Sequence, residues 1–245
     1  MKAMIFAAGY GKRLAPLTDT KPKPLIDVGG RPMLARVIDK IKAAGITTIV
    51  VNIHHLGNLI RTYLDENANF GLNILISDES KQLLDTGGGL VKAATMLDGD
   101  DVLLYNADIL SDFPLPEMIT AHYSTSADVT LLTSDRLTSR YLLFHNGKMC
   151  GWKNEATGEI RTPYPDVVGC SPLAFGGVHI LGPKAISMLK DFARQRGDVF
   201  SITDFYIHCC GKLDIRAYKP TKPFTWFDIG KPATLEMARK YYDQI

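Results

Sequence analysis

A loop with two glycines and several cations follows the first apolar run of the chain. Glycines in such a loop let backbone N–H groups approach a polyphosphate, and nearby cations neutralise its charge. Turn glycines after a strand are common, but such a turn needs neither the cations nor the prolines that stiffen the segment beyond it. We therefore expect phosphate binding by this loop and its cations, which comprise Gly9, Gly11, Lys12, Arg13, Lys21 and Lys23.

Two aspartates far apart in the sequence are candidates for holding a metal ion. Asp108 follows the apolar run 102–105, and Asp228 lies between Trp226 and Gly230, in an apolar context where an unpaired carboxylate would be costly to bury. Magnesium prefers carboxylate, phosphate and water oxygens. A helix cap for Asp108 and a turn for Asp228 are the structural alternatives, and spacing alone does not show that the two residues meet.

Strand and helix patterns alternate through the first half of the chain. Residues 33–41 have apolar side chains at helical spacing, whereas 48–51 are β-branched and typical of a strand. This alternation predicts an α/β fold with a mostly parallel, doubly wound sheet, Rossmann-like or GT-A-like. Ligands bind such sheets at the carboxyl ends of the strands. The patterns predict strands at 3–7, 48–51, 72–76, 101–105, 129–132 and 174–181, and helices at 32–45, 56–64, 90–97, 184–194 and 235–242.

The second half contains a less regular region, rich in Arg, Tyr, Gly and Pro. Asn146-Gly147 and Thr157-Gly158 are typical of hairpin turns. We interpret residues 136–173 as a small β-rich, sugar-binding sub-domain inserted into a core of 1–135 and 174–245, within a single domain 1–245. Ser201 is expected to begin a helix.

The bulk composition excludes several classes of protein. The 245 residues fit one domain, and a formal net charge of +2 gives no reason to expect a nucleic-acid partner. The first apolar run is too short for a secretory signal or a membrane span. The four cysteines lack a metal-ligand spacing and are expected to be reduced thiols. These features predict a cytoplasmic protein with no membrane partner, and they leave its oligomeric state open.

The motifs together resemble the signature of the sugar-1-phosphate nucleotidyltransferases. Within that family they are most similar to short uridylyltransferases acting on N-acetylmuramic acid 1-phosphate, with mannose-1-phosphate guanylyltransferases as near neighbours. The resemblance spans nearly the whole chain, in the expected order. It is carried by Ala7-Ala8-Gly9-x-Gly11-x-Arg13-Leu14-x-Pro16-Leu17-Thr18, Lys21-Pro22-Lys23-Pro24-Leu25, Asp85-Thr86-Gly87-Gly88-Gly89, Asn106-Ala107-Asp108, Phe175-Gly176-Gly177 and Trp226-Phe227-Asp228-Ile229-Gly230.

The resemblance implies in-line attack of a sugar 1-phosphate on the α-phosphorus of a nucleoside triphosphate, with Mg²⁺ as cofactor and pyrophosphate as leaving group. Arg13 would bind the pyrophosphate, Lys23 would bridge the α-phosphate and the sugar phosphate, and Asp108 and Asp228 would hold the metal. The implied nucleotide-binding residues are Ala7, Ala8, Gly9, Gly11, Lys12, Arg13, Lys23, Gly87, Gly88 and Asn106, and the implied substrate residues are Arg140 and Gly177.

Some of these residues have structural alternatives. Thr86 to Gly89 open a helix, where small residues let a base or ribose lie against the backbone, or they form a flexible left-handed connection. Arg140 can meet a lactyl or phosphate anion or lie free on the surface. Lys12 replaces the family's usual threonine, which leaves its role open. Trp152-Lys153-Asn154 replaces the usual Glu-Lys-Pro, so the sugar contacts of that glutamate are in doubt.

Other functions fit parts of the sequence. Within the family, GTP with mannose 1-phosphate or a related hexose or heptose phosphate is the alternative to UTP with an amino-sugar phosphate. A catalytically silent nucleotide-sugar-binding regulatory protein would share the fold but would not need both carboxylates. A glycosyltransferase would carry an Asp-x-Asp motif, whereas this chain has Asn106-Ala107-Asp108.

Overall fold

The computed structural model describes residues 1–242, so the end of the predicted domain 1–245 lies outside it. Ten strands form one mixed sheet, and two short antiparallel pairs lie beside it. The sheet contains β1 (Lys2–Phe6), β4 (Thr48–Ile53), β5 (Asn73–Asp78), β6 (Val102–Asn106), β8 (Val129–Ser134), β9 (Arg140–His145), β10 (Lys148–Asn154), β11 (Ile160–Arg161), β12 (Ser171–Leu181) and β13 (Ile215–Tyr218). The short pairs are β2 (Asp27–Val28) with β3 (Arg31–Pro32), and β7 (Ile109–Ser111) with β14 (Trp226–Asp228).

The N-terminal part of the sheet is parallel, as the alternating strand and helix patterns predicted. Its strands run in the order β5-β4-β1-β6, and each neighbouring pair is parallel. The chain adds β4 and β5 on one side of β1 and then β6 on the other. The loops after β1 and β6 therefore lie at a switch point, where α/β sheets bind ligands. Further along, β12 is antiparallel to both β6 and β8, whereas β13 is parallel to β8.

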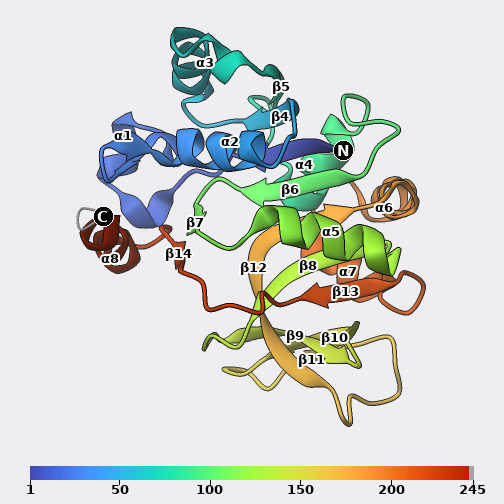
Figure 1. The fold of residues 1–245 in the computed structure, drawn as a ribbon. Coiled ribbons are helices and arrows are strands. Elements are labelled where there is room, and N and C mark those ends of the chain that lie inside the picture. The colour runs from blue at the N-terminus through green and yellow to red at the C-terminus, as the bar shows by residue number, and fades with distance from the viewer. Residues whose placement is uncertain (243–245) are drawn as a thin grey trace.

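Helices cover both faces of the sheet, as a doubly wound fold requires (Figure 1). The apolar side chains of α2, α3 and α5 pack in one core and those of α4, α6 and α7 in the other. None of the helices between residues 1 and 242 has the length and hydropathy needed to cross a membrane. The helices are α1 (Leu17–Thr20), α2 (Met33–Ala43), α3 (Gly57–Glu66), α4 (Asp85–Ala93), α5 (Leu115–Thr125), α6 (Pro183–Arg196), α7 (Ile202–Cys209) and α8 (Pro232–Tyr242), with 3₁₀ turns η1 (Lys12–Leu14), η2 (Lys23–Leu25) and η3 (Ala68–Gly71).

The region predicted as an insertion is largely antiparallel. β9, β10 and β11 pair in sequence, and Asn146 and Gly147, with φ of 48° and 77°, form the left-handed turn expected between β9 and β10. β12 begins at Ser171 and continues into the main sheet, so these strands extend that sheet. The boundaries 136 and 173 stay a prediction. Ser201 caps α7 as expected, because its Oγ accepts a hydrogen bond from the N–H of Thr203.

The C-terminal helix packs against the N-terminal loop segment. Figure 1 shows α8 beside α1, at the side of the sheet where β7 and β14 pair. A third apolar cluster joins these segments, because residues from α8 and its approach pack on residues that follow β1 and β6. Its buried members are Leu14, Ile26, Val28, Met33, Leu110, Ile229, Leu235 and Ala238.

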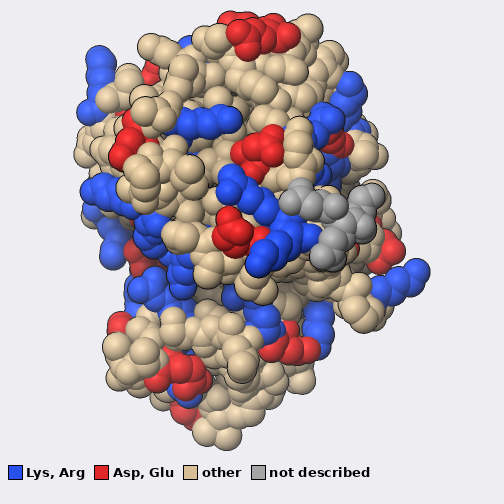
Figure 2. Space-filling model, turned by 90° about the vertical axis from the view of Figure 1, so that its left-hand side faces the viewer, with Lys and Arg blue, Asp and Glu red and all other residues tan. Residues whose placement is uncertain are grey.

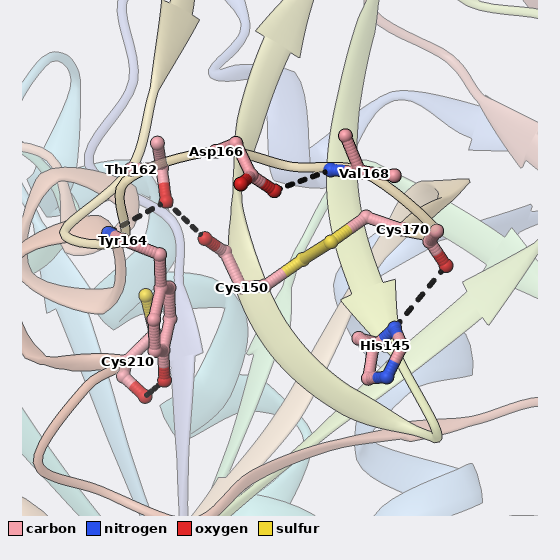
Figure 3. The surroundings of a disulfide bond; sticks show 9 residues. His145, Cys150, Thr162, Tyr164, Asp166, Val168, Cys170 and Cys210 are labelled. Carbon is pink, nitrogen blue, oxygen red and sulfur yellow. Dashed lines mark hydrogen bonds between the residues drawn. A yellow bond between two sulfur atoms is a disulfide. The ribbon is translucent and has the colours of Figure 1, made fainter.

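The expectation of four reduced thiols is wrong for two of the cysteines. A disulfide joins Cys150 and Cys170 (Figure 3). Beside it, the Thr162 hydroxyl donates a hydrogen bond to the carbonyl of Cys150. The neighbours of the two cysteines, Met149 and Ser171, both pair with Phe144 of β9, which brings together cysteines that are 20 residues apart in sequence. The sequence spacing carried no sign of this pairing. The other two cysteines, Cys209 and Cys210, are free and buried, as predicted.

We expect a buried histidine on β12 to make the folding stability depend on pH. His179 on β12 is fully buried, and its Nδ1 shares a hydrogen bond with the hydroxyl of Tyr206. Burial lowers the pKa of His179 from 6.5 to about 3. Between those pH values the unfolded chain binds a proton that the folded chain does not, so stability falls as the pH drops below 6.5.

We expect this one residue to reduce the free energy of unfolding by about 3 kcal/mol between pH 7 and pH 4. Urea unfolding at the two pH values measures the change. The variant His179→Gln keeps a polar partner for Tyr206 but does not titrate, so it should lose correspondingly less stability over the same interval. An equal loss in wild type and variant would contradict the assignment.

Candidate active site

A pocket of about 390 Å³ opens at the predicted switch point, between the carboxyl ends of β1 and β6. Segments from six parts of the chain meet there, and they include five of the ten residues that the sequence analysis placed near the nucleotide. The lining residues are Phe6, Ala7, Ala8, Gly9, Lys23, Pro24, Asn52, Leu83, Asp85, Thr86, Asn106, Ala107, Asp108 and Val199.

The glycine loop folds back on the segment that carries Lys23. Gly11 has a φ of 70°, and a Cβ there would lie 2.7 Å from Cγ2 of Thr18 and 3.3 Å from Cβ of Lys23. The Thr18 hydroxyl donates a 3.0 Å hydrogen bond to the Gly11 carbonyl. Only glycine combines this backbone conformation with such close contact. Gly11 thus belongs to the turn that positions the cations, whereas Ala7, Ala8 and Gly9 line the pocket itself.

Lys23 and Asp108 form an ion pair at the edge of the pocket. The ammonium group of Lys23 contacts Oδ2 of Asp108, and their side chains are 12% and 26% exposed. Lys23 begins η2, and Asp108 lies between β6 and β7. Each charge is partly removed from water, so the pair is held in place while both groups still face the pocket.

Asp228 reaches the same place through the β7–β14 ladder. Asp228 pairs with Ile109, and the N–H of Ile229 donates a 3.0 Å hydrogen bond to the carbonyl of Asp108. The N–H of Gly230 donates to Oδ1 of Asp228 at 2.8 Å. The segments that carry the two aspartates are therefore held together by a two-stranded ribbon.

Gly230 marks the point where the charged groups converge. A Cβ at this residue would lie 2.7 Å from Oδ1 of Asp228, 2.9 Å from Nη2 of Arg13 and 2.9 Å from Nζ of Lys23. The structure thus brings together all four residues assigned to charge neutralisation or metal binding, and their roles stay predictions. The face that carries α1 and α8 is seen in Figure 2, where Lys and Arg side chains gather across the middle with a few Asp and Glu side chains among them.

The donor set at this point suits a hard cation. Two carboxylates with nearby phosphate oxygens and water satisfy the usual coordination of magnesium, which seldom uses an all-protein cage. No cluster of three or more His, Cys, Asp or Glu side chains arranged for a metal ion occurs within the described chain, 1–242.

The glycine run at the start of α4 has a packing role. A Cβ at Gly87 would lie 2.3 Å from the ring of Phe200, and a Cβ at Gly88 would lie 1.8 Å from the carbonyl oxygen of Asp198. The N–H groups of Gly87 and Gly88 donate to the carbonyl of Phe200. These glycines are helical, not left-handed, so the flexible-connection alternative is wrong. Asp85 and Thr86 line the pocket instead, and nucleotide contact by Gly87 and Gly88 stays a prediction.

A buried polar network connects two walls of the pocket, and the sequence analysis missed it. Oδ1 of Asn52 accepts a 2.7 Å hydrogen bond from the N–H of Ala7, and its Nδ2 donates to Oε1 of the fully buried Glu79. Oε2 of Glu79 accepts from the N–H of Leu84. The network holds the glycine loop and the segment before α4 together. A polar residue at the carboxyl end of the buried run 49–51 was the available signal for Asn52.

Asn106 and Gly177 lie side by side at the end of β6. A Cβ at Gly177, where φ is 73°, would lie 3.0 Å from Nδ2 of Asn106 and 2.8 Å from Cγ1 of Ile109. Glycine therefore allows the Asn106 side chain to pass close to β12. Asn106 lines the pocket, whereas Gly177 supports it, and substrate contact by Gly177 stays a prediction.

A second pocket of about 500 Å³ lies over the predicted sugar-binding region. Arg140 lines it, so the structure places this residue at a cavity. Trp152 and Asn154, which replace two of the family's usual residues, line it as well. The full lining is Arg136, Thr138, Arg140, Tyr141, Leu142, Trp152, Asn154, Glu159, Arg161, Phe175, Ser201, Thr203, Asp204 and Ile207.

The remaining polar residues near the glycine loop stabilise its tip. The ring of Tyr10 packs edge-on against His54 at 5.0 Å and lies 5.7 Å from His55. The ammonium group of Lys12 lies 5.2 Å from the centre of the Tyr10 ring. Both histidines thus contact the loop through Tyr10, and Lys12 contacts Tyr10 outside the pocket lining.

These features together define an α/β protein with a pocket at the switch point of its sheet. A model of the nucleotidyl transferase family matches residues 2–149, more than half of the chain. The chain belongs to this family.

Relatives of known activity support the membership. An N-acetylmuramate alpha-1-phosphate uridylyltransferase from Caulobacter vibrioides is 33% identical over 189 residues, which are 74% of this chain and 75% of that protein. Its counterpart from Neisseria meningitidis serogroup B is 43% identical over 132 residues, 50% of this chain and 57% of that protein. A probable mannose-1-phosphate guanylyltransferase from Oryza sativa is 35% identical over 138 residues, 55% and 38% of the two chains. The matches thus span less than two thirds of the Neisseria and Oryza proteins.

Solved structures confirm the fold. A putative glucose-1-phosphate thymidylyltransferase from Bacillus anthracis superposes with a TM-score of 0.82 at 20% identity, covering 100% of this chain and 96% of that one. A UDP-glucose pyrophosphorylase from Acinetobacter baumanii gives a TM-score of 0.77 at 19% identity, covering 98% and 92%. Both likenesses concern the fold alone.

Proposed function

We propose that this protein transfers a nucleoside monophosphate from a nucleoside triphosphate to a sugar 1-phosphate and releases pyrophosphate. One observation carries the proposal: Arg13, Lys23, Asp108 and Asp228 converge beside Gly230, at the edge of a pocket lined by the glycine loop. Attack of one phosphate on another requires that two anions meet, so the needed groups are cations and a metal site. A silent nucleotide-sugar-binding protein would not need both carboxylates.

The residues can be assigned to steps of the reaction. The sugar phosphate is ionised at neutral pH, so no side chain has to remove a proton. Lys23 lies between the pocket and Asp228, where its ammonium group can neutralise the α-phosphate and the incoming phosphate. Arg13 is exposed at the rim, and its planar fork suits the departing pyrophosphate. The backbone of Ala8 and Gly9 would lie against the triphosphate.

We assign the metal site to Asp108 and Asp228, with Mg²⁺ as the ion. The backbone of Asp108 is joined to β14 next to Asp228 by the hydrogen bond from Ile229, and carboxylate oxygens are hard ligands that suit that ion. When bound, it would neutralise the charge that develops on the phosphate oxygens. The protein's own contribution is to fix the two carboxylates, through the hydrogen bond from Gly230 and the ion pair with Lys23.

For the substrates, we propose UTP and N-acetylmuramic acid 1-phosphate. The Caulobacter and Neisseria relatives carry that activity in their names. Arg140 at the second pocket offers a cation for the lactyl carboxylate of such a sugar. The alternative is GTP with mannose 1-phosphate, the activity named for the Oryza relative. The proposed location is the cytoplasm, where nucleoside triphosphates are formed, although a disulfide is uncommon in that compartment.

A pyrophosphate-release assay tests the function. Purified protein with Mg²⁺ is given each of four nucleoside triphosphates and a panel of sugar 1-phosphates. We expect release with UTP and N-acetylmuramic acid 1-phosphate to exceed every other pair by at least tenfold. A preference for GTP with mannose 1-phosphate would favour the alternative, equal use of all four triphosphates would refute the base preference, and no release from any pair would refute the proposed reaction.

A further inference from the structure

An arginine outside the predicted site connects the second pocket with the strand that carries Asp228. Arg136 follows β8 and lines the second pocket. Its Cζ lies 3.9 Å from the ring centre of Trp226, and its Nη2 donates a 2.6 Å hydrogen bond to the carbonyl of Phe175. Trp226 is itself fixed, because its Nε1 donates to the carbonyl of Gly176 at 2.9 Å. Since Trp226 and Asp228 share the short strand β14, Arg136 is tied to the strand that carries a proposed metal ligand.

The hydrogen-bonding capacity of Arg136 is only partly used. A guanidinium has five N–H donors, and Nε of Arg136 is buried without a hydrogen-bond partner among residues 1–242. Burial, the largest effect, lowers the pKa of Arg136, whereas the charge of Asp228 raises it. Arg136 as a whole is half-buried, but its Nε is shielded from water, and a buried donor without a partner is costly. An anion on the pocket side of the guanidinium would supply that partner.

The other cations of this region are engaged differently. Arg161 forms a 2.8 Å ion pair with Asp204, and Arg140 is exposed. Lys153 lies between Trp152 and Asn154 on β10, whose side chains line the pocket. Because neighbouring residues on a strand point to opposite faces, Lys153 points away, and it pairs with Glu155 at 2.8 Å. Arg136 is therefore the cation that combines a place at the second pocket with proximity to Asp228.

We propose that Arg136 binds the phosphate of the acceptor sugar 1-phosphate and holds it between the second pocket and Asp228. The inference rests on the proposed function, because it assigns the acceptor to the second pocket and the triphosphate to the first. The planar fork of Arg136, fixed by stacking on Trp226, would hold two phosphate oxygens and leave a third facing the α-phosphorus. Arg136 thereby serves as a substrate-binding residue for the nucleophile.

Steady-state kinetics of Arg136→Met and Arg136→Lys test the assignment. With the best substrate pair of the wild type, we expect Arg136→Met to raise the KM for the sugar 1-phosphate by about 100-fold, the size expected for a lost charge-assisted pair. The KM for the triphosphate should change less than threefold. Arg136→Lys keeps the charge without the fork and should recover part of the loss. Arg194→Met, a surface change at a side chain that is 77% exposed, is the control and should behave as wild type.

Two results would overturn the assignment: an unchanged KM for the sugar 1-phosphate, or a larger loss from Lys153→Met than from Arg136→Met. If Arg136→Met does not fold, as judged by thermal unfolding, Arg136→Lys decides, with an expected rise in KM of about tenfold. If the wild type turns over no pair of nucleoside triphosphate and sugar 1-phosphate, the proposed function has failed. Binding of inorganic phosphate then tests the role of Arg136 separately. Inorganic phosphate should then shift the indole N–H resonance of Trp226 in the wild type but not in Arg136→Met, and equal shifts in both would refute it.

Discussion

Asp108→Asn is expected to reduce turnover about 1,000-fold while leaving the protein folded. The substitution keeps the size of the side chain and removes the negative charge that would hold the metal ion. Metal ions contribute several kcal/mol of charge stabilisation to phosphoryl transfer, and each 1.4 kcal/mol changes a rate tenfold. The ion pair with Lys23 is lost as well, but Asp108 is 26% exposed and water screens part of that loss. We expect the free energy of unfolding to fall by only about 1 kcal/mol.

Pyrophosphate release and urea unfolding measure the two effects side by side. Asp98→Asn is the matched control, because that side chain is 62% exposed and pairs with Lys190 on the surface. Binding of Mn²⁺ in the presence of the triphosphate, followed by electron paramagnetic resonance, should weaken in Asp108→Asn and not in the control. If Asp108→Asn keeps wild-type turnover, Asp108 does not belong to the metal site.

Gly230→Ala is expected to lower turnover about 100-fold with little loss of stability. The added methyl group would lie within 3 Å of Oδ1 of Asp228, Nη2 of Arg13 and Nζ of Lys23. Two of these atoms are the ends of long, flexible side chains, which can move away at little cost to folding. Their displacement matters for chemistry, because a misplacement of about 1 Å can cost about 100-fold in rate.

Gly211→Ala provides the matched control for this prediction. A Cβ at Gly211 would lie 3.5 Å from Cγ of Pro163, an ordinary contact. The atoms nearest to it belong to Pro163 and Tyr164, and not to Arg13, Lys23 or Asp228. The two variants should unfold at similar urea concentrations, whereas only Gly230→Ala should lose activity. If Gly230→Ala turns over substrate at the wild-type rate, the convergence at this residue has no part in the reaction.

Local patterns predicted much of the fold correctly. The apolar spacing at residues 33–41 predicted a helix where α2 lies, and the β-branched run at 48–51 predicted a strand where β4 lies. The alternation of such patterns predicted the parallel part of the sheet. These features follow from the sequence because helix and strand periodicities are properties of a short stretch of backbone. The same alternation placed the loops after β1 and β6 at the ligand-binding edge, where the pocket lies.

The specific motifs located the charged residues, but the tertiary structure decided which of them meet. Asp228 reaches Asp108 because α8 packs on the segment after β1 and because β14 pairs with β7. Neither contact has a local pattern, since β7 and β14 are three-residue strands. Arg13 and Lys23 join them only because Gly11 turns the loop back.

Several features depend on tertiary packing and have no local sequence pattern. No local pattern indicated that Cys150 would meet Cys170, since the pairing of β9 with both β10 and β12 brings them together. The glycine run before residue 90 indicated a nucleotide contact, yet Gly88 is small because a backbone carbonyl from the segment before α7 lies against it. No local pattern around Arg136 indicates its stacking on Trp226, which depends on the packing of distant segments. A single stretch of sequence encodes its own backbone periodicity, whereas contacts between distant segments depend on how whole elements pack.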